Sequence, residues 1–87
     1  MTKPTLMEFP CHFPIKVIGI NSQVLLDEIK EITIKHFVDF EEEHLTHKVS
    51  QKSNYLAITI TVFAKNQEML DALYQELTKH PDVKMVL

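Results

Sequence analysis

Hydrophobic and polar residues alternate most regularly between Tyr55 and Ala64. One face of this stretch carries Leu56, Ile58, Ile60 and Val62, and the opposite face carries Tyr55, Ala57, Thr59, Thr61 and Phe63. An alternation with period two is typical of a β-strand, and β-branched residues favour a strand that lies inside a sheet. The pattern therefore predicts a central strand over residues 55–64.

Three further segments have strand character. Residues 13–20 place Ile15 and Val17 on one face and Lys16 on the other, while residues 44–51 alternate more weakly. Residues 83–87 are a short terminal strand with Val83, Met85 and Leu87 predicted to face inward. The polar residues 51–54 predict a hairpin turn between the second and third strands.

Two segments have the apolar spacing of helices. Ser22 or Asn21 is a suitable N-cap for a helix that ends near Phe37, with an apolar stripe of Leu25, Ile29, Ile32 and His36. Asn66 is suited to cap a second helix, whose stripe is Met69, Leu70, Leu73 and Leu77 and which ends at His80-Pro81-Asp82.

This order of elements predicts an α+β fold. A split βαββαβ, or ferredoxin-like, two-layer sandwich is expected, with a four-stranded antiparallel sheet and both helices on one face. Residues 1–11 are predicted to be an extended lead-in, because Pro4, Pro10 and Pro14 each disfavour helix at the preceding residue. Residues 12–87 would then form the domain.

The sheet face without helices would carry both polar and apolar side chains. It is predicted to contain Lys16, Ile18, Tyr55, Thr59, Thr61, Phe63, Lys84 and Val86. This face is too mixed for a core and too apolar for a purely solvated surface. Two interpretations remain open: a contact surface, or a solvated face that is rich in β-branched residues.

Several short segments resemble one known family. The segments are Phe9-Pro10, Phe13, Lys16-Val17, Gly19, the run Ser50–Tyr55, Tyr74–Leu77 and the ending Val83–Leu87. In order and spacing they are similar to the YbeD-like family of bacterial proteins. The resemblance implies a ferredoxin-like fold related to ACT-type regulatory domains, and it implies no catalytic residues. The chain departs from the family at Ser53, where Gly is usual and where a positive φ would be strained for Ser.

Composition restricts the possible functions. The chain has 87 residues and one cysteine, Cys11, so it forms one domain without an intrachain disulfide and a cytoplasmic location is expected. Its apolar runs are too short to span a bilayer, and residues 1–10 lack the apolar core of a signal peptide. All nine cationic residues are Lys, so sites that depend on the bidentate Arg fork are excluded, including the phosphate cradle of acylphosphatases.

The candidate catalytic and metal-binding residues form no convincing constellation. His44, His47 and the neighbouring Glu41, Glu42 and Glu43 carry side chains of the kind that bind zinc. His44 and His47 are three residues apart on a predicted strand, however, so their side chains would face opposite sides of it. Cys11 and His12 are adjacent, which rarely gives nucleophile–base geometry. His36 is predicted to be a partly buried structural residue, and His80 is accounted for by the helix dipole.

RNA recognition on the open face is a further alternative. Tyr55, Phe63, Lys16 and Lys84 have suitable chemistry, but the full aromatic signature is missing and the net charge is −3. Both observations argue against nucleic acid as the partner.

The sequence as a whole favours a non-enzymatic binding or regulatory module without a cofactor. The expected partner is another protein, a second copy of the chain in a homodimer, or a small ligand. The candidate contact surface consists of Lys16, Ser50, Lys52, Asn54, Tyr55, Thr59, Thr61 and Phe63. The alternatives are a small metal-dependent enzyme and a weak RNA-binding domain.

Overall fold

The computed structural model describes residues 10–50 and 52–87 of the chain. Its elements follow one another as β1 (Cys11–Ile20), α1 (Gln23–His36), the short 3₁₀ helix η2 (Glu42–His44), β2 (Leu45–Val49), β3 (Tyr55–Ala64), α2 (Gln67–Lys79) and β4 (Val83–Val86). This is the predicted βαββαβ order. β1 begins two residues before the predicted strand, so Cys11 belongs to it. The rest of the predicted lead-in, residues 1–9, lies outside the described residues, and its boundary with the domain stays a prediction.

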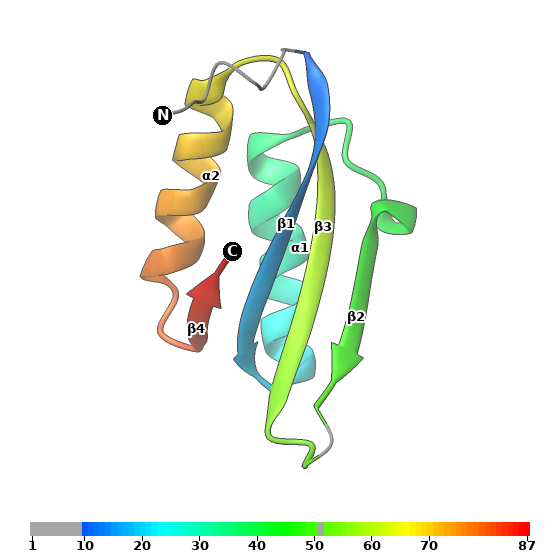
Figure 1. The fold of residues 1–87 in the computed structure, drawn as a ribbon, viewed down its shortest axis with the longest axis vertical. Helices are drawn as coiled ribbons and strands as arrows, with labels where there is room; N and C mark the ends of the chain where they lie inside the picture. Colours follow the sequence, from blue (N-terminus) through cyan, green and yellow to red (C-terminus); the bar gives the residue numbers. More distant parts are fainter. Residues whose placement is uncertain (1–9, 51) are drawn as a thin grey trace.

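The four strands form one antiparallel sheet in the order β2-β3-β1-β4. The two helices lie behind the sheet on a single face, and no helix or strand of residues 10–50 and 52–87 covers the other face (Figure 1). The predicted ferredoxin-like sandwich is therefore confirmed. β1 and β3 pair over ten residues each, whereas the edge strands β2 and β4 are only five and four residues long.

Both helices begin at a side-chain cap. The Ser22 hydroxyl accepts hydrogen bonds from the backbone N–H groups of Val24 and Leu25, and the Asn66 side chain accepts one from Met69 N–H. These bonds satisfy donors that have no partner inside the helix, so the two predicted N-caps are confirmed.

The core lies between the helices and the covered face of the sheet. Its fully buried side chains come from alternate positions of β1 and β3 and from one stripe of each helix: Ile15, Val17, Leu25, Ile29, Leu56, Ile58, Ile60, Val62, Leu70, Leu73 and Leu77. In α1 the buried stripe is rotated from the predicted one, since Thr33 is buried where Ile32 was expected. The helix tolerates Thr33 because its hydroxyl donates to the carbonyl of Ile29 at 2.8 Å.

Because of a β-bulge, the side chains of β4 do not face the sides of the sheet that the sequence pattern predicts. Val86 pairs with Val17 and Met85 pairs with Ile18, but Val83 pairs with Gly19, so Lys84 is an extra residue. Val86 therefore packs against the core, while Met85 and Leu87 are exposed, contrary to the prediction that Met85 and Leu87 face inward. An alternation read along the sequence cannot anticipate such an insertion.

Gly19 allows β1, α1 and the α2–β4 turn to meet closely. A Cβ atom at this position would lie 2.6 Å from the carbonyl oxygen of Asp82 and 2.6 Å from a methyl group of Leu25. Any side chain here would force these segments apart.

The hairpin between β2 and β3 contains a strained residue. Ser53 has φ 59°, in the left-handed region that favours glycine. The strain expected for Ser at this turn position is therefore present.

Candidate functional site

The open face of the sheet is formed by the outward-pointing residues of the four strands. β1 contributes His12, Pro14, Lys16, Ile18 and Ile20, β3 contributes Tyr55, Ala57, Thr59, Thr61 and Phe63, β2 contributes Thr46 and Lys48, and β4 contributes Met85. Ile20, Tyr55, Phe63 and Met85 are each at least 40% exposed, which is high for large apolar side chains. We call all the outward-pointing residues named in this paragraph the open face.

The strand register arranges the open face in cross-strand rows. Lys16, Thr59 and Thr46 form one row, and Met85, Ile18, Ala57 and Lys48 form the next. At the end of the sheet nearest α2's first turn, the His12 ring packs against Phe63 with ring centroids 4.9 Å apart. Apolar side chains therefore run along the sheet with lysines beside them.

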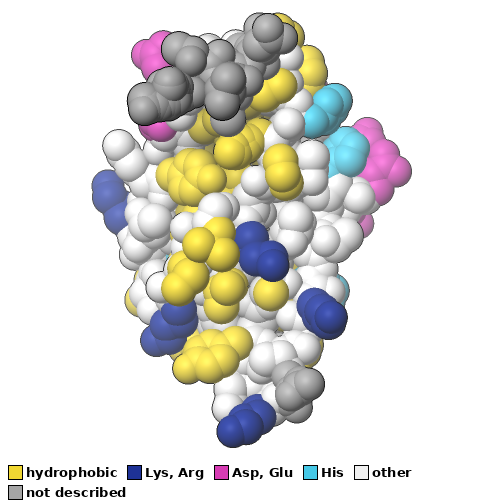
Figure 2. Space-filling view, in the orientation of Figure 1, with side chains coloured by type: hydrophobic (Ala, Val, Ile, Leu, Met, Phe, Trp, Pro, Cys, Tyr) yellow, Lys and Arg dark blue, Asp and Glu magenta, His cyan; other side chains and the backbone are white. Residues whose placement is uncertain are grey.

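Charge is distributed unevenly around the molecule. None of the outward-pointing residues named above is acidic, whereas the helices carry Asp27, Glu28, Glu31, Glu68, Asp71 and Glu76. Figure 2 shows hydrophobic side chains and lysines over the strands, with carboxylates only at the margin of the part not covered in grey. A chain with a net charge of −3 thus presents a locally cationic face.

The candidate contact residues fall into two groups. Lys16, Tyr55, Thr59, Thr61 and Phe63 all lie on the open face. Ser50, Lys52 and Asn54 lie in the hairpin, where two of them have structural roles. The Ser50 hydroxyl accepts a hydrogen bond from Tyr55 N–H, and the Asn54 carbonyl accepts one from Asn21 N–H.

Several open-face residues were not identified as contact residues from the sequence. His12 is one, and starting the first strand at Cys11 instead of Phe13 would have placed it beside Lys16 on the same face. Lys48 lies in the weakly patterned β2, and Met85 is on this face only because of the bulge.

The histidines do not form the sites considered from the sequence. Among residues 10–50 and 52–87, no group of three or more His, Cys, Asp or Glu side chains is placed to hold a metal ion. Cys11 and His12 point to opposite faces of β1, since Cys11 pairs with buried Ala64 and His12 with exposed Phe63. His44 lies beside Phe40, with ring centroids 6.1 Å apart.

Two histidines join the helices. His36 Nε2 lies 2.8 Å from Glu76 Oε1, and His80 Nε2 contacts the carboxylate of Glu28. The hydrogen bond from His36, helped by Lys35, lowers the pKa of Glu76 from its ordinary value, although partial burial opposes the shift. His36 is half-buried, as expected for a structural residue. His80 does more than complement the helix dipole, because its Nδ1 also accepts a hydrogen bond from Asp82 N–H.

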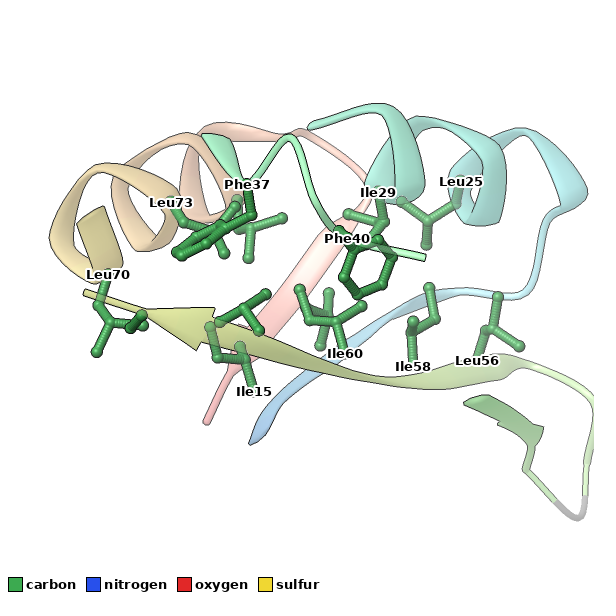
Figure 3. Packing of buried hydrophobic residues seen from close by; sticks show 14 residues of the cluster. Ile15, Leu25, Ile29, Phe37, Phe40, Leu56, Ile58, Ile60, Leu70 and Leu73 are labelled. Atoms are coloured by element: carbon green, nitrogen blue, oxygen red, sulfur yellow. The ribbon is translucent and has the colours of Figure 1, made fainter. Parts of the chain in front are cut away.

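A pocket of about 130 Å³ lies at the end of the molecule where α1 ends and β2 begins. Phe37, Phe40 and Met69 line it from the helix side, and His12, Thr61 and Phe63 line it from the sheet side. The exposed polar residues Asp39, His44 and Lys65 complete the lining. Phe37 and Phe40 point from the segment after α1 toward β3 (Figure 3). The walls are therefore largely aromatic, with polar groups at the opening.

Residues 4–87 match the profile of a family described as "Protein of unknown function (DUF493)". The chain belongs to this family. A relative named "UPF0250 protein" from Leptothrix cholodnii is 43% identical over 95% of this chain and 91% of its own length. A relative of the same name from Neisseria gonorrhoeae is 41% identical over 98% of this chain and 93% of its own length. The resemblance to YbeD-like proteins is therefore confirmed.

Two solved structures share the fold of this DUF493 member. Protein HP0495 from H. pylori superimposes with a TM-score of 0.77 at 20% identity, over 98% of this chain and 88% of that protein. The ACT domain from GTP pyrophosphokinase of Chlorobium tepidum superimposes with a TM-score of 0.66 at 20% identity, over 87% of this chain and 84% of that domain. At this level of identity the likeness establishes an ACT-like fold and nothing about activity.

No helix in the described part of this DUF493 protein has the length and apolarity needed to cross a bilayer. The cytoplasmic location expected from the single cysteine stays a prediction.

Proposed function

We propose that this DUF493 protein is a non-enzymatic binding module whose open face binds another protein. The observation that supports the proposal is the combination on one face of exposed apolar side chains, two lysines and no carboxylate among the outward residues described. Exposed Ile20, Tyr55 and Met85 supply the apolar area that drives association. Exposed apolar side chains that lie together on one face, rather than singly, are typical of sites that bind a partner.

The lysines define the chemistry of the partner. Lys16 and Lys48 flank the apolar rows, and Lys84 lies exposed in β4. A partner with carboxylates around an apolar centre would complement this arrangement. Complementary charge at the rim of an interface chiefly accelerates association and selects the partner.

Nucleic acid is a poorer match to the same face. Tyr55 and Phe63 are eight residues apart on β3, roughly 26 Å along the strand, so the two rings cannot stack on neighbouring bases. The Phe63 ring is also already packed against His12. A protein surface, which can contact apolar groups along the whole face, is the better occupant.

Affinity capture with matched variants tests the proposal. The wild-type chain and the double variant Lys16→Glu/Lys48→Glu are immobilised, and proteins retained from a lysate of the native host are quantified. Lys79→Glu is the control, because Lys79 lies at the end of α2, behind the sheet. We expect one or more proteins that are retained by the wild type and by Lys79→Glu and lost from the double variant, with retention falling as salt rises.

Two other results would contradict the proposal. Equal retention by all three variants would show that the open face is not the binding surface. Salt-dependent binding of a single-stranded U₂₀ RNA, lost in the double variant, would favour the RNA alternative instead. Light scattering of the purified chain separates a homodimer from binding of a different protein.

A further inference from the structure

The edge of β3 that faces β2 is only partly paired. Leu45 to Val49 of β2 pair with Ile60 to Leu56 of β3, so the ladder stops at Ile60 while β3 continues to Ala64. The chain just before β2 forms η2, and its main-chain bond from His44 N–H to the Glu41 carbonyl is local. Leu45 and Ile60 form a non-hydrogen-bonded pair, so the last rung of the ladder joins the Thr61 N–H to the His44 carbonyl. Beyond this rung, within residues 10–50 and 52–87, the sheet register pairs no backbone group from this side with the Thr61 carbonyl or with Phe63.

The hydrogen-bond register identifies which groups are unpaired. Ser50 N–H donates to the Tyr55 carbonyl, so the main-chain groups of Tyr55 point toward β2. Because successive residues of a strand point alternately to its two neighbours, and the β1–β3 register is unbroken, Thr61 and Phe63 also point their N–H and C=O groups to that side. Val62 and Ala64 point theirs toward β1.

This edge lacks the features that usually prevent strand addition. The segment Thr61-Val62-Phe63-Ala64 contains no charge, no proline and no bulge. The protruding edge of β1 on the opposite side of the ribbon differs, since Pro14 removes an N–H group there. At this end, the β3 edge thus offers three free main-chain groups: the Thr61 carbonyl and the N–H and carbonyl of Phe63.

The pocket lies directly beside this edge. Thr61 and Phe63 line it together with Phe37, Phe40 and Met69, and its volume of about 130 Å³ is close to that of a cavity that holds a benzene-sized group. A strand added along β3 would direct alternate side chains to the two faces of the sheet. One of them would therefore enter the pocket.

The segment that borders the pocket is acidic. Asp39, Glu41 and Glu43 are exposed, and no described cation forms an ion pair with them, whereas Glu42 pairs with Lys30. A basic side chain beside the apolar one would complement this border.

We propose that the β3 edge at Thr61–Ala64 accepts an extended peptide from another protein as an added strand. The peptide continues the line of β2, places one aromatic or branched apolar side chain in the pocket, and directs a Lys or Arg toward residues 39–43. Backbone hydrogen bonds to the Thr61 carbonyl and to both main-chain groups of Phe63 provide affinity, and the pocket provides specificity. The site shares Thr61 and Phe63 with the open face but uses their main-chain edge, and it does not need Lys16 or Lys48.

A random heptapeptide library displayed on phage, selected against the full chain, tests the proposal. We expect selected peptides to share an apolar residue next to a basic one. Phe63→Pro, which removes an N–H group that neither ladder uses, is expected to weaken binding about tenfold or more relative to Phe63→Leu, which keeps this N–H. N-methylation of alternate peptide nitrogens should abolish binding, and this result stands even where Phe63→Pro fails to fold.

Amide hydrogen exchange supplies an internal control. With saturating selected peptide, exchange at Phe63 is expected to slow about tenfold or more. Val62 and Ala64 should change little because they point toward β1, and Thr61 should change little because its N–H already belongs to the ladder with β2. The proposal is overturned if no peptide binds better than its scrambled version, or if N-methylated peptides bind equally well. Self-association that Phe63→Pro abolishes and Phe63→Leu keeps would identify a second copy as the occupant and would overturn the partner-peptide assignment.

Discussion

The two ends of the β1–β3 pair are held by different kinds of contact. At the hairpin end, hydrogen bonds join segments that are distant in sequence: Ile20 N–H donates to the Asp82 carbonyl, and Asn21 donates to the carbonyls of Ser53 and Asn54. At the pocket end, the main-chain bonds given for residues 37–41 are local, such as Phe40 N–H to the Phe37 carbonyl. That segment is attached to the domain through the buried rings of Phe37 and Phe40.

This difference bears on where ligands can bind. Hydrogen bonds fix distance and direction, so the hairpin end has one well-defined arrangement. Apolar packing is non-directional, so the pocket end can adjust when a group enters. The pocket and the unpaired β3 edge both lie at this second end.

Phe37→Ala tests whether aromatic packing holds the pocket end, and it has the largest expected effect. Phe37 is 5% exposed, so its truncation should lower the free energy of unfolding by about 3 kcal/mol. Urea denaturation measures the loss. Val38→Ala is the matched control, since Val38 is 79% exposed and should change stability by less than about 0.5 kcal/mol. Similar losses in both variants would refute the role given to Phe37.

Gly19→Ala tests the close approach at the hairpin end. The added Cβ would meet the Asp82 carbonyl and the Leu25 side chain, and relieving this contact should cost about 1–3 kcal/mol. Amide NMR signals should move near residues 20–22 and 80–83 and stay in place at residues 37–44. Lys16→Ala, at an exposed position of the same strand, should be close to neutral. Signal changes spread equally over both ends would remove the distinction between them.

The sequence predicts the parts of this fold that depend on local patterns. The alternation of Tyr55–Ala64 and the caps Ser22 and Asn66 were read correctly because each acts within a few residues. The facing of Met85 was wrong because the bulge at Lys84 arises from pairing with β1, which the sequence of β4 does not encode by itself.

The pocket and the free edge of β3 were not predicted for a related reason. The pocket needs His12, Phe37, Phe63 and Met69 to meet, and these residues come from four separate segments. The edge is free only because η2 turns the chain away before β2 begins pairing at Leu45.

Ser53→Gly should stabilise the hairpin end by a smaller amount. Glycine adopts the φ of 59° without the steric cost that Ser incurs, and part of this gain is offset by the greater flexibility of glycine in the unfolded chain. The expected net gain is about 0.5–1 kcal/mol, or a rise in Tm of about 2–6 °C. Lys52→Gly is the control, because Lys52 does not have positive φ, and it should not raise the Tm. An unchanged or lower Tm for Ser53→Gly would mean that the turn is not strained.

The smallest effect is expected for Glu76→Gln, and it appears only as a dependence on pH. Glu76 fixes His36, a residue that lines the pocket, and the hydrogen bond from His36 is the main reason that the pKa of Glu76 lies below its ordinary value of 4.5. Because the pKa is lower in the folded chain, the carboxylate adds stability above about pH 4.5 and this contribution disappears as the pH falls through the folded pKa. Wild type should therefore exceed Glu76→Gln in unfolding free energy at pH 7, and the difference should shrink as the pH falls below 4.5 and through the folded pKa.

Glu31→Gln provides the comparison for this profile, since Glu31 is exposed on α1 and forms no ion pair with a described residue. Its difference from wild type should stay small across the same pH range in urea titrations. If Glu76→Gln followed the Glu31→Gln profile, the contact with His36 would not contribute to stability in solution. His36 would then be free to move, and the pocket end would depend on Phe37 and Phe40 even more strongly than the structure indicates.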